Sequence, residues 1–173
     1  SHNQYKIEVD AIYELTAKNP IPFREDLNNR RLLWHGSRLT NFVGILSNGL
    51  RIAPIEAPVT GYMFGKGVYF ADVVSKSANY CYATKLNSTG CLLLCEVALG
   101  TSCEKFYADY YAHLVIENEF QSVKGVGKKA PKDGEMLEEV FVPNGHLVET
   151  GISNVSDMIY RPPCITTSMW YTT

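Results

Sequence analysis

The sequence predicts an α+β domain in which short strands outnumber short helices, and three stretches carry that prediction. Residues 91–99, CLLLCEVAL, are a near-continuous apolar run of strand length, as expected for a central strand covered on both faces. Residues 31–35, RLLWH, are mostly apolar and predict a second buried strand. Residues 61–83 combine a glycine-rich loop, a β-branched and aromatic strand at 68–71, and a helix. The ligand site is expected between the stretch that begins at Gly61 and the tetrapeptide WHGS at 34–37.

Periodicity predicts the elements near the N-terminus. Tyr5–Glu14 alternates apolar and polar residues, which is the period-two pattern of a half-buried strand. From Thr40 a short amphipathic helix is expected, capped by Thr40 or a neighbour and stopped at Asn48 and Gly49. The apolar face of this helix consists of Phe42, Ile45 and Leu46.

The chain after residue 100 is expected to be rich in loops. Residues 122–128, SVKGVGK, have the composition of a loop. Residues 138–142, EEVFV, indicate a short strand, and a last strand is expected to begin at Met158.

The stretch from 61 to 83 brings three kinds of side chain to one place. Glycines at 61, 65 and 67 let the backbone turn sharply and approach a ligand closely. Asp72 is placed to cap the helix that follows it. On that helix Ser77 and Tyr80 stand three residues apart, and Lys76 and Tyr80 stand four apart. A hydroxyl, an aromatic ring and a cation are therefore expected on the same wall.

Composition limits the classes of function. With 173 residues, 46% of them hydrophobic, the chain is long enough for one domain with a core that needs neither metal nor disulfide. A net charge of −2 excludes an overall basic field that would attract nucleic acid. No apolar run is long enough to cross a membrane, and residues 1–20 lack the pattern of a signal peptide. Five cysteines without paired metal-ligand spacing indicate an intracellular, reducing compartment.

The same residues also have simpler interpretations. Taken alone, His35 at a strand end is more often a structural histidine, and Tyr69 and Tyr80 are more often core aromatics. The glycine loop lacks the spacing of a P-loop, and no strand precedes it to support a dinucleotide-binding fold. Composition and spacing therefore predict an α+β domain with a ligand-sized glycine loop and leave its ligand open.

Five ordered blocks of sequence make the prediction sharper. They are RLLWHGSR at 31–38, GILSNGLRIAP at 44–54, GYMFGKGVYFAD at 61–72, SKSANYC at 75–81 and EVALG at 96–100. In these blocks the chain resembles the catalytic domain of the nuclear poly(ADP-ribose) polymerases, and the DNA-damage-responsive members most of all. The resemblance extends from about Tyr5 to Lys128.

This resemblance implies a split antiparallel β-sheet ADP-ribosyltransferase fold of the diphtheria-toxin type, with short helices. It implies that residues 1–173 are a single catalytic domain without the helical regulatory domain of the DNA-responsive members. NAD+ would be the substrate, no metal would take part, and ADP-ribose would pass to an acceptor with loss of nicotinamide.

The resemblance also assigns roles to ten residues. His35 and Tyr69 would be catalytic: His35 would hold ribose hydroxyls, and Tyr69 would stack with Tyr80 on either side of the nicotinamide ring. Gly36 would pair its backbone with the nicotinamide amide. The other cofactor-binding residues would be Ser37, Asn41 and Arg51 near the adenosine half, Tyr62 over the ligand, Lys76 beside the reacting ribose, and Ser77 at the nicotinamide amide.

The glutamate of the family motif has no counterpart in the best alignment, where Pro162 occupies its position. Proline has no charge and no hydrogen-bond donor, so it cannot polarise a ribose hydroxyl. Glu149 and Asp157 are the nearby acids that could replace the glutamate. Protein ADP-ribosylation is therefore expected with single transfer rather than polymer growth. An inactive module that binds NAD+ or ADP-ribose and an NAD+ glycohydrolase are the alternatives.

The expected partners follow from the same resemblance. They are NAD+ and protein acceptors, either histone-like or the chain itself, with no direct binding of nucleic acid and no membrane contact. The resemblance implies a nuclear location. Without the regulatory domain, access of NAD+ to the cleft is expected not to depend on DNA.

Overall fold

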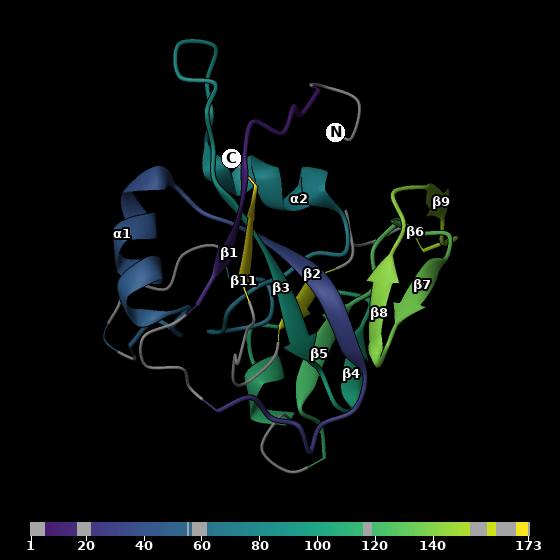
Figure 1. Ribbon diagram of the computed structural model, residues 1–173. Coiled ribbons are helices and arrows are strands. Elements are labelled where there is room, and N and C mark those ends of the chain that lie inside the picture. The colour runs from purple at the N-terminus through teal and green to yellow at the C-terminus, as the bar shows by residue number, and fades with distance from the viewer. Residues whose placement is uncertain are drawn as a thin grey trace.

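In the computed structural model the regular secondary structure consists mainly of short strands (Figure 1). The residues that the structure describes are 6–16, 22–54, 56, 62–115, 119–152, 159–161 and 169–172. Among them strands outnumber helices, which confirms the α+β prediction. None of the helices in these ranges is both long and apolar enough to cross a bilayer.

A six-stranded sheet forms the centre of the fold. In spatial order its strands are β1 (Ile12–Leu15), β11 (Met169–Thr172), β3 (Leu92–Ala98), β2 (Arg30–Gly36), β8 (Val140–Pro143) and β7 (Gly134–Leu137). Neighbouring strands are antiparallel except for β2 and β8, which are parallel. The longest pairing joins β2 and β3, from Arg30 opposite Ala98 to Gly36 opposite Leu92.

The predicted central strand lies where the apolar run indicated. Leu93, Cys95 and Val97 of β3 have at most 1% of their surface exposed and pack against Leu33 of β2. The described cysteines 81, 91, 95 and 103 are free thiols, as expected for a reducing compartment. Burial raises the pKa of the Cys95 thiol, which makes it a core residue rather than a nucleophile.

Helix α1 (Leu39–Asn48) covers one end of this core. It ends at the predicted stop, where Gly49 has a φ of 74° and donates its N–H to the carbonyl of Ile45. Phe42 is buried, but Leu46 is 52% exposed, so the predicted apolar face was wrong at that position. The expected cap at Thr40 was also wrong, because Arg38 precedes the helix without a side-chain cap.

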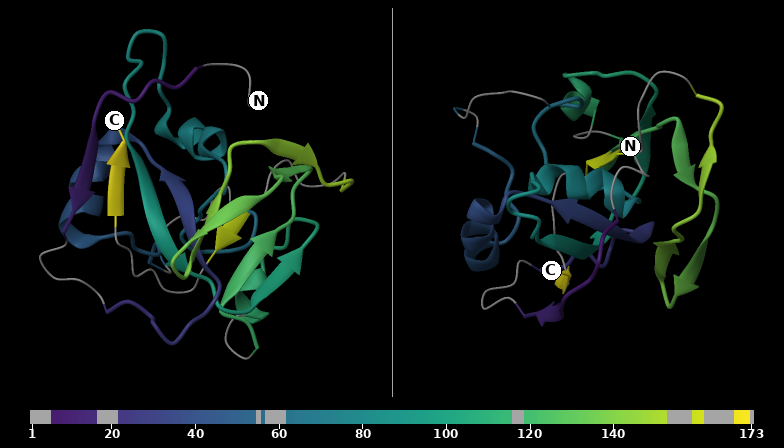
Figure 2. Two further views of the ribbon diagram at one scale, coloured as in Figure 1. Left: turned by 45° about the vertical axis from the view of Figure 1, so that its right-hand side comes forward. Right: turned by 90° about the horizontal axis from the view of Figure 1, so that it is seen from above.

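Smaller sheets complete the fold on the side away from α1 (Figure 2). One contains β10 (Ile159–Arg161), β5 (Ser122–Gly125) and β4 (Ser102–Lys105), and the other contains β6 (Lys129–Pro131) and β9 (Leu147–Glu149). A short 3-10 helix, η2 (Ala112–Val115), lies between β4 and β5. The strand expected from Met158 is β10, which begins at Ile159, but it is not the last, because β11 follows it. The strand expected at 138–142 is β8.

The loop predicted at 122–128 was wrong in its first half. Ser122–Gly125 is a strand that pairs parallel with β4 and antiparallel with β10. Val123 is fully buried, and the Ser102 and Ser122 hydroxyls lie 2.6 Å apart in a hydrogen bond. Lys124 and the glycines at 125 and 127 gave the segment 122–128 the composition of a loop, although pairing partners bury its first half.

Two further predictions need correction. Of the described residues within Tyr5–Glu14, those from Ile12 onward form a strand, and Ile7 and Val9 are 39% and 57% exposed. The strand expected at 68–71 is reduced to bridge residues at Phe70 and Ala71, and Ala71 pairs with Trp34.

The helix expected at 73–83 is shorter in the structure than the sequence pattern predicts. It consists of α2 (Val74–Ala78) followed by the 3-10 helix η1 (Asn79–Cys81), and Tyr82 ends it with a φ of 54°. Asp72 does not cap α2, because the residue at the cap position is Val73.

Candidate functional site

A cavity of about 620 Å³ lies between the end of β2, helix α1, the glycine loop and the α2–η1 segment. All ten residues assigned by the sequence resemblance line it. They are His35, Gly36, Ser37, Asn41, Arg51, Tyr62, Tyr69, Lys76, Ser77 and Tyr80. Segments that are up to 45 residues apart in the sequence therefore meet at one place.

His35 is held in a defined orientation at the end of β2. Its Nδ1 lies 2.9 Å from the carbonyl oxygen of Tyr69. A carbonyl only accepts, so Nδ1 carries the proton and Nε2 is left as an acceptor in the neutral ring. Burial lowers the pKa of His35, and the bond to Tyr69 opposes this only in part. The ring is therefore neutral at pH 7 and presents one acceptor nitrogen.

Gly36 lies against the backbone of α2. A Cβ at this position would lie 1.9 Å from the carbonyl oxygen of Ser77, closer than any side chain allows. Glycine is therefore required here by the close approach of β2 and α2. The approach also leaves the Gly36 backbone at the cavity wall, without a side chain in front of it.

Two sets of hydrogen bonds join α2 and the segment before it to β2. The Ser77 hydroxyl, which is 4% exposed, donates to the carbonyl of Trp34 at 2.9 Å. Trp34 and Ala71 exchange two backbone hydrogen bonds, of 2.8 and 2.9 Å. These contacts fix the two motif segments relative to each other before any ligand binds.

Tyr69 connects the cavity to the glycine loop. Its hydroxyl donates to the carbonyl of Gly65 at 2.5 Å and accepts the N–H of Phe64 at 3.1 Å. Its ring lies 6.1 Å from that of Tyr62, with an interplanar angle of 31°. Tyr80 also lines the cavity and is 50% exposed. One aromatic ring is therefore fixed by the loop, and the other stands at the open rim.

The residues expected near the adenosine half lie together beside α1. Asn41 donates its side-chain amide to the Ser37 hydroxyl at 2.9 Å. Arg51 donates from Nε to the carbonyl of Asn48 at 3.3 Å. Both donors belong to exposed residues, so a ligand can reach them from solvent.

The cavity has a positive lining. Its charged residues are Arg51 and Lys76, and among the described lining residues none is acidic. The described residues also hold no cluster of three His, Cys, Asp or Glu side chains that could bind a metal ion. A cavity lined by cations and by no described carboxylate favours the binding of an anionic group such as a phosphate.

No acid that could replace the motif glutamate is found among the described residues that line this cavity. Glu149 lies on β9, is 71% exposed and pairs with Lys129 at 3.7 Å. It does not line the cavity. Asp157 and Pro162 lie outside the described residues.

Sequence reasoning missed one polar residue of the site. Tyr82 also lines the cavity, and the guanidinium of Arg38 stacks on its ring at 4.1 Å from the centroid. The sequence contains a signal for this residue, because Tyr82 lies two positions after Tyr80, in the segment that turns away from the helix. Met63 and Gly67 belong to the glycine loop, which was expected to cover the ligand together with Tyr62. The other lining residues that were not predicted are Ile45, Leu50, Val68, Phe70 and Ala71.

Comparison with known proteins adds independent information. The family profile described as "Poly(ADP-ribose) polymerase catalytic domain" matches residues 1–162. Poly [ADP-ribose] polymerase 2 of Homo sapiens is 52% identical over 157 residues, which cover 89% of this chain and 27% of the relative.

Two plant relatives give a similar result. Poly [ADP-ribose] polymerase 2 of Arabidopsis thaliana is 54% identical over 159 residues, which cover 88% of this chain and 25% of the relative. Poly [ADP-ribose] polymerase 1 of the same organism is 48% identical over 168 residues, covering 93% and 17%.

The identities and coverages establish the family of the chain. It spans about a quarter or less of the length of the curated relatives it matches, so the likeness concerns one part of them. The family match covers nearly all of its 173 residues. The chain therefore belongs to the poly(ADP-ribose) polymerase family and corresponds to its catalytic domain.

Proposed function

We propose that this chain is an NAD+-dependent protein ADP-ribosyltransferase, which moves ADP-ribose from NAD+ to a protein side chain and releases nicotinamide. The gathering of the ten motif residues around one cavity carries this proposal. The cavity has a volume typical of small-molecule sites, and its charged groups are cations that suit the pyrophosphate of NAD+.

The nicotinamide end of the ligand lies beside Gly36 in this proposal. The exposed backbone of Gly36 pairs with the carboxamide, and the Ser77 hydroxyl turns from Trp34 to the same group. Tyr69 and Tyr80 stack on the two faces of the ring. Because the ring is positively charged before the reaction, electron-rich aromatic faces hold it well.

His35 binds a ribose hydroxyl, and Lys76 stands beside the reacting ribose. The neutral Nε2 of His35 accepts a hydrogen bond from a ribose hydroxyl, since Nδ1–H is already used by Tyr69. The bond between the ribose C1′ and the nicotinamide nitrogen breaks, and its electron pair neutralises the ring. An acceptor oxygen then bonds to C1′ and loses its proton. The intermediate state resembles an oxocarbenium ion, which a firmly held ribose stabilises.

We further propose that transfer stops after one ADP-ribose. The position of the motif glutamate is Pro162 in the best alignment, and proline can neither accept a proton nor orient a second ribose hydroxyl. The same observation supports the second candidate function, a module that binds NAD+ or ADP-ribose without turnover.

The wider setting belongs to the same proposal. The sheets correspond to the split antiparallel ADP-ribosyltransferase fold of the diphtheria-toxin type, and residues 1–173 act as one catalytic domain. The acceptors are histone-like proteins or the chain itself, the location is the nucleus, and neither a metal nor direct contact with nucleic acid is needed.

The test is incubation with labelled NAD+, with free nicotinamide and labelled protein measured separately for the wild type and His35→Ala. One discrete labelled band with nicotinamide release supports single transfer. A ladder of larger products would contradict the single-transfer proposal. Nicotinamide without labelled protein indicates a glycohydrolase, and binding of NAD+ in calorimetry without any release indicates the binding module.

A further inference from the structure

Tyr82 is a polar lining residue of the NAD+ cavity that none of the roles above uses. Its side chain is 59% exposed, and its backbone has a φ of 54° and a ψ of 33°. This left-handed region is uncommon for a bulky residue, and such a conformation persists where the surroundings fix it. The chain therefore holds this ring at the rim of the cavity against a local backbone preference.

Contacts from two directions hold Tyr82 in place. The preceding residue, Cys81, is buried, and its thiol donates to the carbonyl of Cys91 at 3.2 Å. The guanidinium of Arg38 lies over the ring of Tyr82, with its carbon 4.1 Å from the ring centroid. A guanidinium over an aromatic face is attracted by the ring and restricts its orientation. The ring is therefore fixed from the start of β3 and from the residue before α1.

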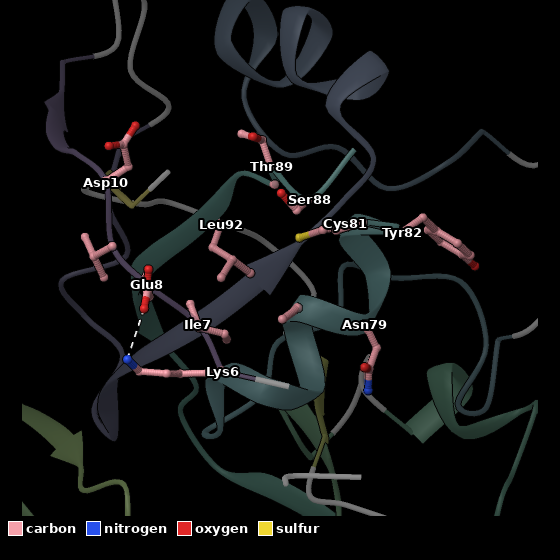
Figure 3. Close-up of a pocket in the computed structure, with 14 residues that line it drawn as sticks. Lys6, Ile7, Glu8, Asp10, Asn79, Cys81, Tyr82, Ser88, Thr89 and Leu92 are labelled. Carbon is pink, nitrogen blue, oxygen red and sulfur yellow. Dashed lines mark hydrogen bonds and ion pairs between the residues drawn. The ribbon is translucent and has the colours of Figure 1, made fainter. Parts of the chain in front are cut away.

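A second cavity, of about 510 Å³, also has Tyr82 in its lining (Figure 3). Figure 3 shows the Tyr82 side chain extending away from the other labelled side chains of this cavity, such as Ile7 and Leu92. The polar end of Tyr82 is therefore directed out of the second cavity.

The donors of the Tyr82–Arg38 pair are available to a ligand. Among the described residues, none forms a hydrogen bond or an ion pair with the Tyr82 hydroxyl or the Arg38 guanidinium. Both side chains are exposed, so a ligand can reach them from solvent. A phenol hydroxyl and a guanidinium both donate to phosphate oxygens, and the guanidinium also brings a positive charge. The pair is therefore a preformed set of donors for an anion.

Neighbours in the sequence relate the pair to the two halves of NAD+. Tyr82 comes two residues after Tyr80, which stacks on the nicotinamide ring in the proposed function. Arg38 directly follows Ser37, which lies at the adenosine half in the same proposal. The group that joins the two halves of NAD+ is its diphosphate. A pair that borders both halves is therefore well placed to contact the diphosphate.

Arg38 adds positive charge where the lining has little. The two charged lining residues, Lys76 and Arg51, are each assigned to one end of the ligand, and Nε of Arg51 donates to the carbonyl of Asn48. Arg38 is not itself a lining residue, but its guanidinium lies against the ring of Tyr82, which is. A third cation next to the rim favours a group that carries two negative charges.

We propose that Tyr82, positioned by Arg38, binds the diphosphate of NAD+ at the rim of the cavity. The Tyr82 hydroxyl donates to a phosphate oxygen, and the guanidinium against its ring offsets the negative charge. Tyr82 is a binding residue and Arg38 is a positioning residue. The proposal rests on the proposed function only in that the cavity binds NAD+ or ADP-ribose, because no transfer is needed for this contact.

The first test compares ligands with and without a diphosphate on the full chain. Tyr82→Phe should weaken ADP-ribose about tenfold in calorimetry, the loss of one hydrogen bond to a charged group. The affinities for nicotinamide and for adenosine, measured by ligand-observed NMR titration, should not change, because neither contains a phosphate. Tyr107→Phe, which removes the hydroxyl of a side chain that is 66% exposed and outside the lining, should change none of the three. Equal ADP-ribose affinity in the wild type and Tyr82→Phe would overturn the proposal.

The second test concerns Arg38. Arg38→Ala should weaken ADP-ribose about tenfold and make its affinity less sensitive to salt, because a charge near the ligand is lost. Arg38→Lys should keep the salt sensitivity and lose part of the affinity, since an ammonium does not stack as a guanidinium does. The control is Arg31→Ala, which removes the same charge from a guanidinium stacked on Phe141 at 4.9 Å and should leave ADP-ribose affinity unchanged. Equal losses of nicotinamide and ADP-ribose affinity in Arg38→Ala would show a merely structural role and overturn the proposal.

The outcomes separate this contact from the proposed function. The expected ADP-ribose results without nicotinamide release from NAD+ would support the diphosphate contact and contradict the transferase. Labelled protein from NAD+, together with equal ADP-ribose affinities of the wild type, Tyr82→Phe and Arg38→Ala, would support the transferase and overturn the contact. Less labelled protein at unchanged ADP-ribose affinity would place Tyr82 at the protein acceptor, which would also overturn it.

Discussion

At the scale of single residues, Gly36 is the position where the shape of the site depends most directly on residue type. The space for its missing side chain is filled by the carbonyl of Ser77. Gly36→Ala should therefore move β2 away from α2, lower the melting temperature by several degrees and weaken NAD+ binding at least tenfold in calorimetry. The matched control is Gly44→Ala in α1, where nothing lies within 4 Å of the new Cβ. That change should stabilise the protein slightly, because alanine favours helix. Equal effects of the two changes would contradict the close-approach argument.

His35 gives a prediction about pH. Its pKa is lowered from 6.5 in the folded protein, so the unfolded chain binds this proton more readily. Stability from this residue is therefore present above pH 6.5 and is lost as the pH falls toward the lower folded pKa. The free energy of unfolding, measured in urea at pH 7.5 and 5.5, should fall more in the wild type than in His35→Asn. The asparagine amide keeps a donor for Tyr69 but does not titrate. An identical fall in both proteins would contradict the assignment.

At the scale of elements, the glycine loop depends on a single hydroxyl. Tyr69→Phe removes two hydrogen bonds and leaves the N–H of the fully buried Phe64 without that acceptor. We expect a loss of about 1–3 kcal/mol in the free energy of unfolding and a higher KM for NAD+. Tyr107→Phe, which removes a hydroxyl from a side chain that is 66% exposed, should change neither quantity. An unchanged stability and KM in Tyr69→Phe would show that the loop is held by other contacts.

The elements also show what sequence patterns can and cannot reveal. The strands around 31–35 and 91–99 are predictable, because long apolar runs are buried wherever they lie. Strand β5 is not predictable in this way, since Lys124 and Gly125 fit a sheet only through the pairing of distant segments. Likewise, the alternation of residues 6–10 predicts a strand, but Ile7 and Val9 are exposed and lie outside β1, whose described pairing with β11 covers Ile12–Leu15.

The residues of the site were predictable for a different reason. Their sequence blocks resemble a known family, whereas His35 or Tyr69 alone would have been assigned to the core. The structure supplies what the blocks do not contain, namely that Glu149 lies away from the cavity and that Tyr82 belongs to it.

At the scale of the whole molecule, charge predicts the response to nucleic acid. Residues 1–102 hold ten basic and eight acidic residues and the remainder holds six and ten, so neither part has a basic field. A fluorescent DNA duplex with broken ends should therefore show no change in anisotropy with this chain at physiological salt, and nicotinamide release should not respond to it. Binding that weakens steeply with added salt would contradict this prediction.

The α2–η1 segment and Tyr82, which follows it, lie between two cavities, and this has a thermodynamic consequence. Tyr82 lines both cavities, so its position is part of the boundary of each. A ligand that favours one position of this ring in the first cavity would change the shape of the second. The free energy of such a coupling is the same in both directions, so a ligand in either cavity would alter the affinity of the other cavity by the same factor. A wall eight residues long would thus let occupancy on one side report on the other without any movement of the sheet.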